Sequence, residues 1–303
     1  MILRRIKRVI KLEALYIQTS KLECLAFSNF LQTRNHGALS SVNVDVKENG
    51  VAIVFLNRPN ARNALNTSLA SQLLDVFEGI KYKSIKAKGN SSIKAVVLSG
   101  YGKSFCAGAD LKERQGMTNE QWESQHEIFQ KCCLAYQSLP IPTIAAANGH
   151  AFGGGFELIC LSDWAFATSS AQFGFPEVRL GIFPGLGGTQ TLPRLIGINA
   201  ARRLILTGAT LNANEGYQLG LFTGIEVDGS ATLQAAIHDA NLVAKNGPLA
   251  VQLAKRAIWE GYQIPKFKDA WNFSLELYGK SFKSQERIEG INAYNEKRHP
   301  KFE

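Results

Sequence analysis

The chain has 303 residues, of which 45% are hydrophobic and 19% are charged, a balance typical of one large or two moderate globular domains. No run of about 18 or more apolar residues occurs, which argues against a membrane-spanning helix. The net charge of +9 is concentrated at the N-terminus, because residues 1–40 hold seven Lys or Arg and two acids, whereas residues 41–303 hold 27 and 23. The remaining body is only weakly basic, which argues against a nucleic-acid surface on it.

Residues 1–40 are rich in Arg, Lys and Ser, and their apolar residues would share one face of a helix that Glu13 interrupts. This composition predicts a mitochondrial targeting presequence and, with it, a protein of the mitochondrial matrix. The alternative is a disordered tail or one that docks on the surface. The segment is left out of the predicted fold in either case.

From Gly50 onward, strand-like and helical patterns alternate. Four runs predict strands, at Val51–Leu56, Ile93–Leu98, Thr143–Ala147 and Trp164–Thr168. Two segments between them have helical spacing, Ser68–Ile80 and Thr118–Leu139. This alternation predicts an α/β core in which helices cross over between parallel strands.

The second of these helices has a predicted cap and one apolar stripe. Thr118 is the expected N-cap, and Gln121 completes a capping box. His126 falls on the stripe, so we expect it to be a packed helix residue and not a catalytic one. The polar and basic connector Lys81–Lys94 is predicted to be a solvated loop, and binding of an acidic partner is the minor alternative.

Beyond Gly188, helical patterns dominate. The predicted helices are Leu192–Leu206, Leu233–Lys245, Pro248–Tyr262, Lys268–Phe282 and Glu286–Lys297, and Asn212–Glu215 resembles the start of a short one. We therefore divide the chain into a core of residues 41–240 and a helical C-terminal region of residues 241–303. Such a region folds over its own core or packs against another subunit.

The cysteines and histidines form no metal-binding or disulfide pattern. The five cysteines (Cys24, Cys106, Cys132, Cys133 and Cys160) contain no C-x-x-C pair, and the five histidines are scattered. We expect no metal site, no disulfide framework and a reducing compartment. Cys106 could act as a nucleophile, but no histidine is predicted beside it, and packing is the favoured role.

The stretch from Ile141 to Gln190 contains the main candidate chemistry. Gly153, Gly154 and Gly155 separate a strand-like run from a helix-like run that carries Glu157. The N-terminus of that helix offers free backbone N–H groups to a developing negative charge. Glu177 lies 20 positions further on, again in apolar surroundings, and two carboxylates in such a site suit proton transfer near neutral pH. The structural alternatives are glycines for tight packing and a glutamate that caps a helix.

A second donor candidate is the small-residue stretch Ser104–Lys112, which follows the predicted strand Ile93–Leu98. Within it, Asp110 is either a site residue or a helix cap, and Lys112 is either a surface charge or a phosphate contact. The loop Pro184–Thr189 lacks the Gly-Lys-Ser/Thr ending of a phosphate loop, so we interpret it as a turn into the following helix.

Five motifs now form a recognisable pattern. They are NRPNARNALN at Asn57–Asn66, FCAGADLKER at Phe105–Arg114, PTIAAANGHAFGGGFEL at Pro142–Leu158, FGFPEVRLGIFPGLGGTQ at Phe173–Gln190 and ERIEGINAYNEKRHPKF at Glu286–Phe302. In this order, across about 250 residues, they resemble the enoyl-CoA hydratase/isomerase (crotonase) family. AGADLKER and EKRHPKF are most similar to its 3-methylglutaconyl-CoA hydratase branch.

The resemblance implies a crotonase-like spiral of ββα units followed by a helical trimerisation region, assembled as a homotrimer or homohexamer. It implies an acyl-CoA thioester substrate, with coenzyme A as part of the substrate and no separate cofactor. Backbone N–H groups of Ala109 and Gly154 would hold the thioester oxygen. The further substrate-binding and CoA-binding residues that it implies are Asp110, Leu111, Lys112 and Arg62, in addition to Ala109.

The resemblance also implies hydration of the 2,3 double bond, with Glu157 activating water and Glu177 protonating Cα, in fatty-acid or leucine catabolism. The alternatives are a Δ3,Δ2-enoyl-CoA isomerase that uses Glu177 alone and an RNA-binding protein on the same scaffold. Asn63–Ile80 contains no Lys or Arg, which argues against RNA. Thr191 and the long Lys81–Lys94 connector depart from the family pattern and leave the acyl preference open.

Overall fold

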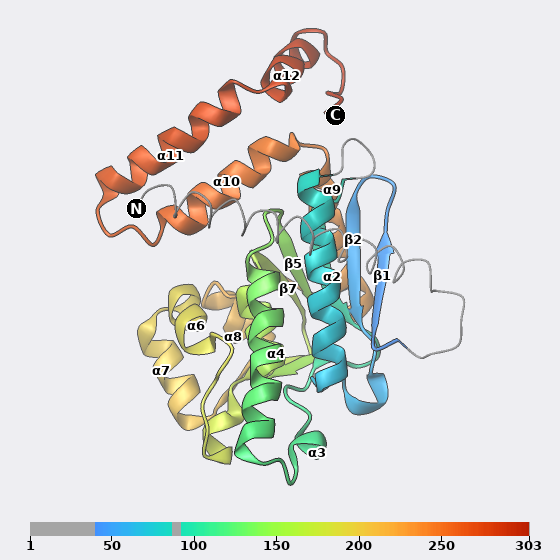
Figure 1. Ribbon diagram of the computed structural model, residues 1–303, viewed down its shortest axis with the longest axis vertical. Helices are drawn as coiled ribbons and strands as arrows, with labels where there is room; N and C mark the ends of the chain where they lie inside the picture. The colour runs from blue at the N-terminus through green and yellow to red at the C-terminus, as the bar shows by residue number, and fades with distance from the viewer. Residues whose placement is uncertain (1–39, 87–91, 303) are drawn as a thin grey trace, which may run out of the picture.

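The computed structural model describes residues 40–86 and 92–302. The predicted presequence, residues 1–40, lies outside this part of the chain except for Ser40, so it stays a prediction. The described chain forms a body of two sheets and their covering helices, and a group of C-terminal helices extends from one side of it (Figure 1).

The larger sheet has six strands in the order β1-β2-β3-β5-β7-β10. Their bounds are Val42–Val46, Val51–Leu56, Ala95–Gly100, Thr143–Ala147, Trp164–Thr168 and Gly224–Glu226. β1 pairs antiparallel with β2, and every other pairing is parallel. β3 and β5 are buried along their whole length, as expected for parallel strands with both faces covered. All four predicted strands are present, although β3 begins and ends two residues later than the predicted Ile93–Leu98.

The second sheet has four short strands in the order β4-β6-β8-β9, with bounds Ser104–Cys106, His150–Phe152, Gln172–Gly174 and Thr210–Asn212. β4, β6 and β8 run parallel, and β9 is antiparallel to β8. Each of the three parallel strands directly follows one strand of the large sheet, so the chain alternates between the sheets. This alternation, with a helix after each pair, is the spiral of ββα units that was predicted.

Two long helices, α2 (Thr67–Lys86) and α4 (Asn119–Gln137), lie side by side over the body (Figure 1). The rings of Phe77 and Tyr136 meet between them, with centroids 4.8 Å apart. The predicted capping box of α4 is confirmed, since Thr118 Oγ1 accepts from the Gln121 N–H and Gln121 Oε1 accepts from the Thr118 N–H.

Two predicted boundaries are wrong. The connector predicted to begin at Lys81 is helical through Lys86, because lysine is a good helix former and this last turn still packs on the body, with Ser84 buried. The helix predicted over Leu192–Leu206 is two helices, α6 (Gly188–Ile196) and α7 (Ile198–Thr207). They are separated by Gly197, whose φ of 80° lies in the left-handed region where a helix ends.

The remaining helices are α8 (Ala213–Gln218), α9 (Gly229–Ala244), α10 (Pro248–Gly261), α11 (Phe267–Phe282) and α12 (Gln285–Asn295). α9 covers the large sheet with Ala236, Ala240 and Ala244 and crosses residue 240, where the sequence analysis divides the chain. α10 is tied to the body by Lys255, whose Nζ lies 2.7 Å from Asp163 Oδ2. In residues 40–86 and 92–302, no helix is long and apolar enough to cross a membrane.

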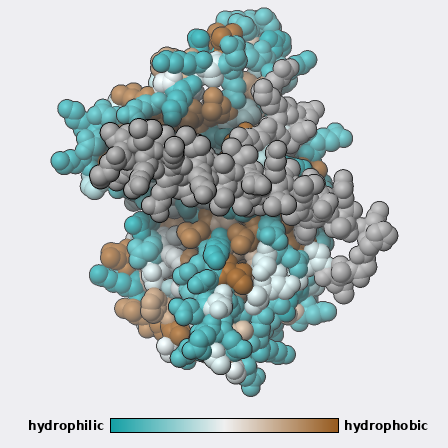
Figure 2. Space-filling view, in the orientation of Figure 1, coloured by the Kyte–Doolittle hydropathy of each residue, from teal (hydrophilic) through white to brown (hydrophobic). Residues whose placement is uncertain are grey.

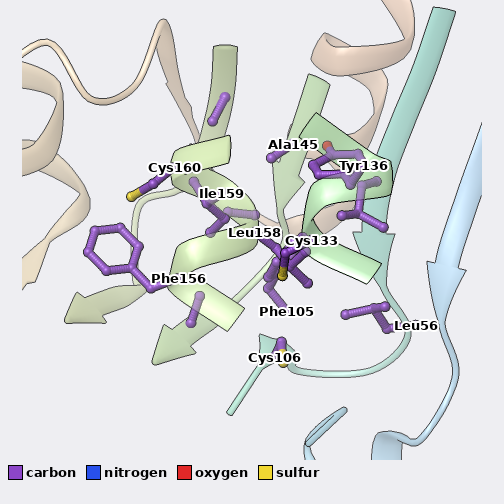
Figure 3. Close-up of a cluster of buried hydrophobic side chains, with 14 of the residues drawn as sticks. Leu56, Phe105, Cys106, Cys133, Tyr136, Ala145, Phe156, Leu158, Ile159 and Cys160 are labelled. Atoms are coloured by element: carbon purple, nitrogen blue, oxygen red, sulfur yellow. The ribbon is translucent and has the colours of Figure 1, made fainter. Parts of the chain in front are cut away.

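Helix α5 (Gly154–Leu161) lies at the centre of the body (Figure 3). Its residues from Gly154 to Cys160 are all buried. Leu158 and Ile159 lie on the side of Phe105 of β4 and Cys133 of α4, whereas Phe156 points the other way and packs against Phe173 and Phe175. A helix that is apolar on every side is stable only when it is enclosed, so the sequence of α5 requires this central place.

Gly155 lets α5 approach β4. An ideal Cβ on Gly155 would lie 2.4 Å from the carbonyl oxygen of Cys106, a distance that real Cβ atoms do not tolerate. Gly155→Ala should therefore lower the free energy of unfolding by about 1–3 kcal/mol through overpacking, as measured by urea denaturation. Gly261→Ala is the control, because Gly261 also lies in a helix and has no atom within 4 Å of an added Cβ. Equal stability of the two variants would contradict this packing argument.

Candidate active site

Three chain segments meet at one edge of the small sheet. β4, β6 and β8 are adjacent and parallel, so their carboxyl ends lie at the same edge. The chain continues from these ends into Ala107–Ala109, Gly153–Gly154 and Pro176–Glu177, and all three segments line a cavity of about 380 Å³. The position of an ideal Cβ on Gly153 is 3.1 Å from Glu177 Oε1 and 3.7 Å from the Cα of Gly108, which shows how close the segments are.

Backbone N–H groups without an acceptor face this cavity. Among them, the N–H groups of Ala109 and Gly154 donate to no other residue in the described part of the chain. For Gly154 the reason is its place at the first turn of α5, where no preceding turn supplies a carbonyl. The partial positive charge at the N-terminus of α5 strengthens the attraction of the Gly154 N–H for a negatively charged atom.

The loop that carries Ala109 is held rigidly against the chain after η2 (Pro59–Ala61). Leu65 donates its N–H to Gly108 O at 2.8 Å, and Asp110 donates its N–H to Leu65 O at 2.8 Å. The Asp110 carboxylate caps the short helix α3 (Leu111–Arg114) and pairs with Arg58, with Oδ2 3.0 Å from Nη1. The Asp110 side chain is therefore a helix cap, one of the two roles considered for it, and its assignment to substrate binding stays a prediction.

Glu157 is buried beside the cavity, with 1% of its surface exposed. Its Oε1 accepts the N–H groups of Leu186 at 2.7 Å and of Gly188 at 2.8 Å. Both donors belong to the loop Pro184–Thr189, which sequence analysis interpreted only as a turn. Gly188 is required there, because a Cβ would lie 2.7 Å from Phe175 Cζ and 3.1 Å from Glu157 Oε1.

The pKa of Glu157 is raised to about 7, chiefly because burial disfavours the ionised carboxyl. The N–H groups of Gly188 and Leu186 act in the opposite direction, and the nearby charge of Glu177 adds to the increase. At neutral pH the group therefore exchanges readily between its acid and base forms, as proton-transfer catalysis requires.

Glu177 lies in the short 3-10 helix η4 (Pro176–Leu180), which follows β8. Its Oε2 is buried and has no hydrogen-bond partner among the described residues. Burial raises the pKa of Glu177, while a backbone N–H and the charge of Arg114 oppose the increase. A buried carboxyl oxygen without a protein partner beside an open cavity is available to a bound molecule.

The rest of the cavity wall is mainly apolar and aromatic. Side chains from α3, from α4 and from the segment after Glu177 contribute to it, namely Leu111, Arg114, Trp122, His126, Phe129, Leu180, Ile182 and Phe183. Trp122, His126 and Phe129 lie on the apolar stripe of α4 on which His126 was predicted to pack. The spacing was a usable signal, but it could not show that the stripe faces a cavity. His126 is half-buried in this wall and its ring lies against Gly185, so its predicted non-catalytic role stays a prediction.

The other predicted residues lie apart from this cavity. The side chains of Lys112 and Arg62 are exposed, and neither lines it. Their assignment as CoA contacts stays a prediction. Cys106 is fully buried, and burial raises the pKa of its thiol to about 12, which fits packing better than nucleophilic chemistry.

The geometry generates a stability prediction for Glu157. Its folded pKa is raised from 4.5 to about 7, so the ionised carboxyl weakens the fold increasingly from about pH 4.5 upward and fully above pH 7. A glutamine at this position keeps an oxygen that can accept both N–H groups. Glu157→Gln should thus stabilise the protein at pH 8 by up to about 3 kcal/mol and much less at pH 5, as measured by denaturation at both pH values. Glu123→Gln, an exposed change on α4, is the control, and a pH-independent effect of Glu157→Gln would refute the prediction.

Known proteins share this chain's sequence and fold. A family model described as enoyl-CoA hydratase/isomerase matches residues 46–303. The chain is 38% identical over 253 residues to the short-chain-enoyl-CoA hydratase of Clostridium acetobutylicum, covering 83% of this chain and 94% of that protein. It is 35% identical over 257 residues to enoyl-CoA hydratase domain-containing protein 2, mitochondrial, of Mus musculus, covering 84% of each.

A solved structure agrees with these relationships. The crystal structure of enoyl-CoA hydratase from Bacillus anthracis matches with a TM-score of 0.81 at 38% identity, over 86% of this chain and 98% of that one. Sequence and fold therefore lead to the same assignment. The chain belongs to the enoyl-CoA hydratase/isomerase (crotonase) family.

Proposed function

We propose that this protein is an enoyl-CoA hydratase, which adds water across the 2,3 double bond of an acyl-CoA thioester. The observation that carries the proposal is that two carboxyl groups, Glu157 and Glu177, line one cavity with the unpaired N–H groups of Ala109 and Gly154. Relatives named as hydratases support it. An isomerase needs one of these carboxyl groups, whereas water addition uses two.

The thioester carbonyl is bound by the two N–H groups. As a nucleophile adds at Cβ, negative charge moves to the thioester oxygen and forms an enolate. The N–H groups of Ala109 and Gly154 stabilise that charge more strongly than they stabilise the neutral carbonyl. The loss of one such donor costs about 3–4 kcal/mol in the transition state, so their fixed positions are essential.

Glu157 is the proposed base that takes a proton from water. The two N–H groups on Oε1 favour the carboxylate and hold it in one orientation, while Oε2 accepts from no described residue. A pKa of about 7 keeps a substantial fraction ionised at neutral pH. The water oxygen then bonds to Cβ as its proton passes to Glu157.

Glu177 is the proposed acid that delivers a proton to Cα. Its pKa is raised by burial, which favours the protonated form that this step needs. After the two transfers Glu157 holds a proton and Glu177 has lost one, so a proton must be exchanged with solvent or between them before the next turnover. No separate cofactor is needed for these steps, because coenzyme A is part of the substrate.

The cellular setting is a proposal of the same kind. A mitochondrial relative and the composition of residues 1–40 favour the mitochondrial matrix. Hydration of enoyl thioesters there belongs to fatty-acid or branched-chain amino-acid catabolism, including that of leucine. Lys112 and Arg62 would contact the CoA phosphates outside the cavity, since both side chains are exposed and cationic.

The C-terminal helices are proposed to join copies of the chain into a homotrimer or homohexamer. Hydrophobic surface occurs on the C-terminal helices and on the body below them (Figure 2). The most exposed large side chains on α10 and α11 and in the segment between them are Ile258, Tyr262, Phe267, Trp271 and Tyr278. So much exposed apolar surface is typical of a protein interface.

Light scattering on the purified protein should give three or six times the chain mass, because this apolar surface would be buried between copies. Replacing Trp271 and Tyr278 together by Glu should reduce that mass to one chain, since charges are unfavourable in an apolar interface. Replacing the exposed residues Glu123 and Glu127 of α4 by Gln is the control. A monomeric native protein would contradict the assembly.

The two-carboxyl mechanism predicts matched kinetic losses. Glu157→Gln and Glu177→Gln should each lower kcat for hydration of crotonyl-CoA by about 100-fold or more, because each removes one proton-transfer group. Ultraviolet absorbance of the enoyl thioester measures the reaction. Near-normal hydration by either variant would refute the two-carboxyl mechanism. Isomerisation of a 3-enoyl-CoA by the native protein without hydration of crotonyl-CoA would favour the isomerase alternative.

A further inference from the structure

A second cavity, of about 710 Å³, lies at the carboxyl edge of the large sheet, and we call it the α9 pocket. It shares no lining residue with the cavity of the candidate active site. Residues at the ends of four neighbouring strands line it, namely Phe55 of β2, Ser99 of β3, Asn148 after β5 and Thr168 of β7. Crevices outside the carboxyl ends of parallel strands are the usual ligand sites of open α/β sheets.

The pocket lies where α9 begins to cover the large sheet. Phe166 of β7 belongs to the same apolar cluster as Ala236 of α9. Alternate residues of a strand point to the same face, so Thr168, two residues beyond Phe166, faces the α9 side as well. The first residue of α9, Gly229, lies at the strand ends, because a Cβ there would be 2.9 Å from the carbonyl oxygen of Asn148. Thr168 is thus placed between the sheet and the first turn of α9.

Thr168 brings an unsatisfied hydroxyl to this pocket. The residue is 3% exposed, and its Oγ1 has no hydrogen-bond partner among the described residues. The neighbouring polar groups are satisfied within the sheet, since Ser99 Oγ donates to Ala146 O at 3.0 Å and Asn148 Oδ1 accepts from the Gly100 N–H at 3.1 Å. A buried hydroxyl is costly without a partner, so the Thr168 hydroxyl is available to a bound molecule.

The N-terminus of α9 supplies further donors. This helix has 16 residues, and the N–H groups of its first two residues, Gly229 and Ser230, donate to no described residue. The N-cap residue Asp228 is the one carboxylate among the described residues of the pocket wall, and its Oδ1 accepts the Ala231 N–H at 2.8 Å. Free N–H groups and the partial positive charge of a helix N-terminus favour an anion.

Lys103 supplies a positive charge to the same wall. Its side chain is exposed and forms no ion pair with a described residue. His150 also lines the pocket, and its Nδ1 is used as the acceptor of the Gln172 N–H at 3.0 Å. The charge of Lys103 offsets that of Asp228. The helix N–H groups and the Thr168 hydroxyl are then left to bind an anion.

The wall also contains an aromatic surface. The rings of Phe55 and Tyr101 are stacked, with centroids 4.4 Å apart and planes 9° from parallel. Tyr101 is nevertheless 38% exposed, so part of its ring is open to a ligand. Nucleobases stack on exposed aromatic rings of this kind. The volume of about 710 Å³ lies within the roughly 300–1,000 Å³ of small-molecule sites.

We infer that the α9 pocket binds a mononucleotide, with its phosphate at the N-terminus of α9 and Lys103 and its base on Tyr101. The Thr168 hydroxyl donates a hydrogen bond to the same ligand. The site is separate from the candidate active site, and the inference does not depend on the proposed hydration.

The test uses isothermal titration calorimetry of the full chain with AMP and adenosine, which differ only in the phosphate. The native protein should bind AMP at least about tenfold more tightly than adenosine. Thr168→Val and Lys103→Met should each weaken AMP by roughly tenfold or more, the scale of a hydrogen bond to a charged group. Thr168→Val should not lower the urea midpoint of unfolding, because its hydroxyl has no described protein partner to lose.

Lys131→Met, which removes an exposed cation of α4, is the control for a general loss of positive charge and should leave AMP affinity unchanged. A second control separates the two cavities. Saturating butyryl-CoA, a thioester that cannot be hydrated, should leave AMP affinity unchanged, because the cavities share no residue. Failure of butyryl-CoA to bind would count against the proposed function alone, since the two pocket variants still test the nucleotide site.

Three results would overturn the inference. The first is no binding of AMP by the native protein at millimolar concentration, or equal affinity for AMP and adenosine. The second is unchanged AMP affinity in Thr168→Val and Lys103→Met. The third is displacement of AMP by butyryl-CoA, which would place AMP in the candidate active site.

Discussion

The candidate site depends on the parallel alignment of three three-residue strands, β4, β6 and β8. Parallel neighbours end at the same edge, so the residues that follow them arrive together although they are far apart in sequence. The free N–H of Ala109, the start of α5 and Glu177 each follow one of these strand ends. Each strand is too short to be stable alone and is held by pairing with its neighbours in the small sheet.

Burial of Glu157 is the main energetic conflict in the structure. α5 is enclosed because nearly all of its residues are apolar, and the carboxyl group is carried into the core with them. The N–H groups of Leu186 and Gly188 compensate only partly, since the pKa remains raised. Burial of the Glu157 carboxyl weakens the fold above neutral pH, and the same burial gives this carboxyl a pKa suited to its proposed role as a base. At this residue, stability is therefore reduced in favour of the proposed activity.

Sequence patterns predicted the long helices and strands well, because a periodic pattern of apolar residues can be recognised only over several residues. β2, β5 and β7 match the predicted runs within their bounds, and so does the capping box of α4. The three-residue strands escaped prediction because two or three residues show no alternation. The contact of the Pro184–Thr189 loop with Glu157 could not be predicted, because it is made by backbone N–H groups and the identity of the side chains does not show where those groups point. Arg114 lies within one of the family motifs, but the orientation of its side chain in the cavity wall depends on a hydrogen bond to Gln125, eleven residues further along the chain.

By itself, the sequence determined the α/β class, the family resemblance, and Glu157 and Glu177 as the candidate acid and base. These follow from local composition, spacing and motif order. Only the tertiary structure decided which groups are free and which are engaged. Asp110 is used in capping α3 and pairing with Arg58, Glu157 Oε1 has two donors, and Glu177 Oε2 has no partner among the described residues. The physical reason is that hydrogen bonding and desolvation depend on neighbours in space, which the chain brings together only when it folds.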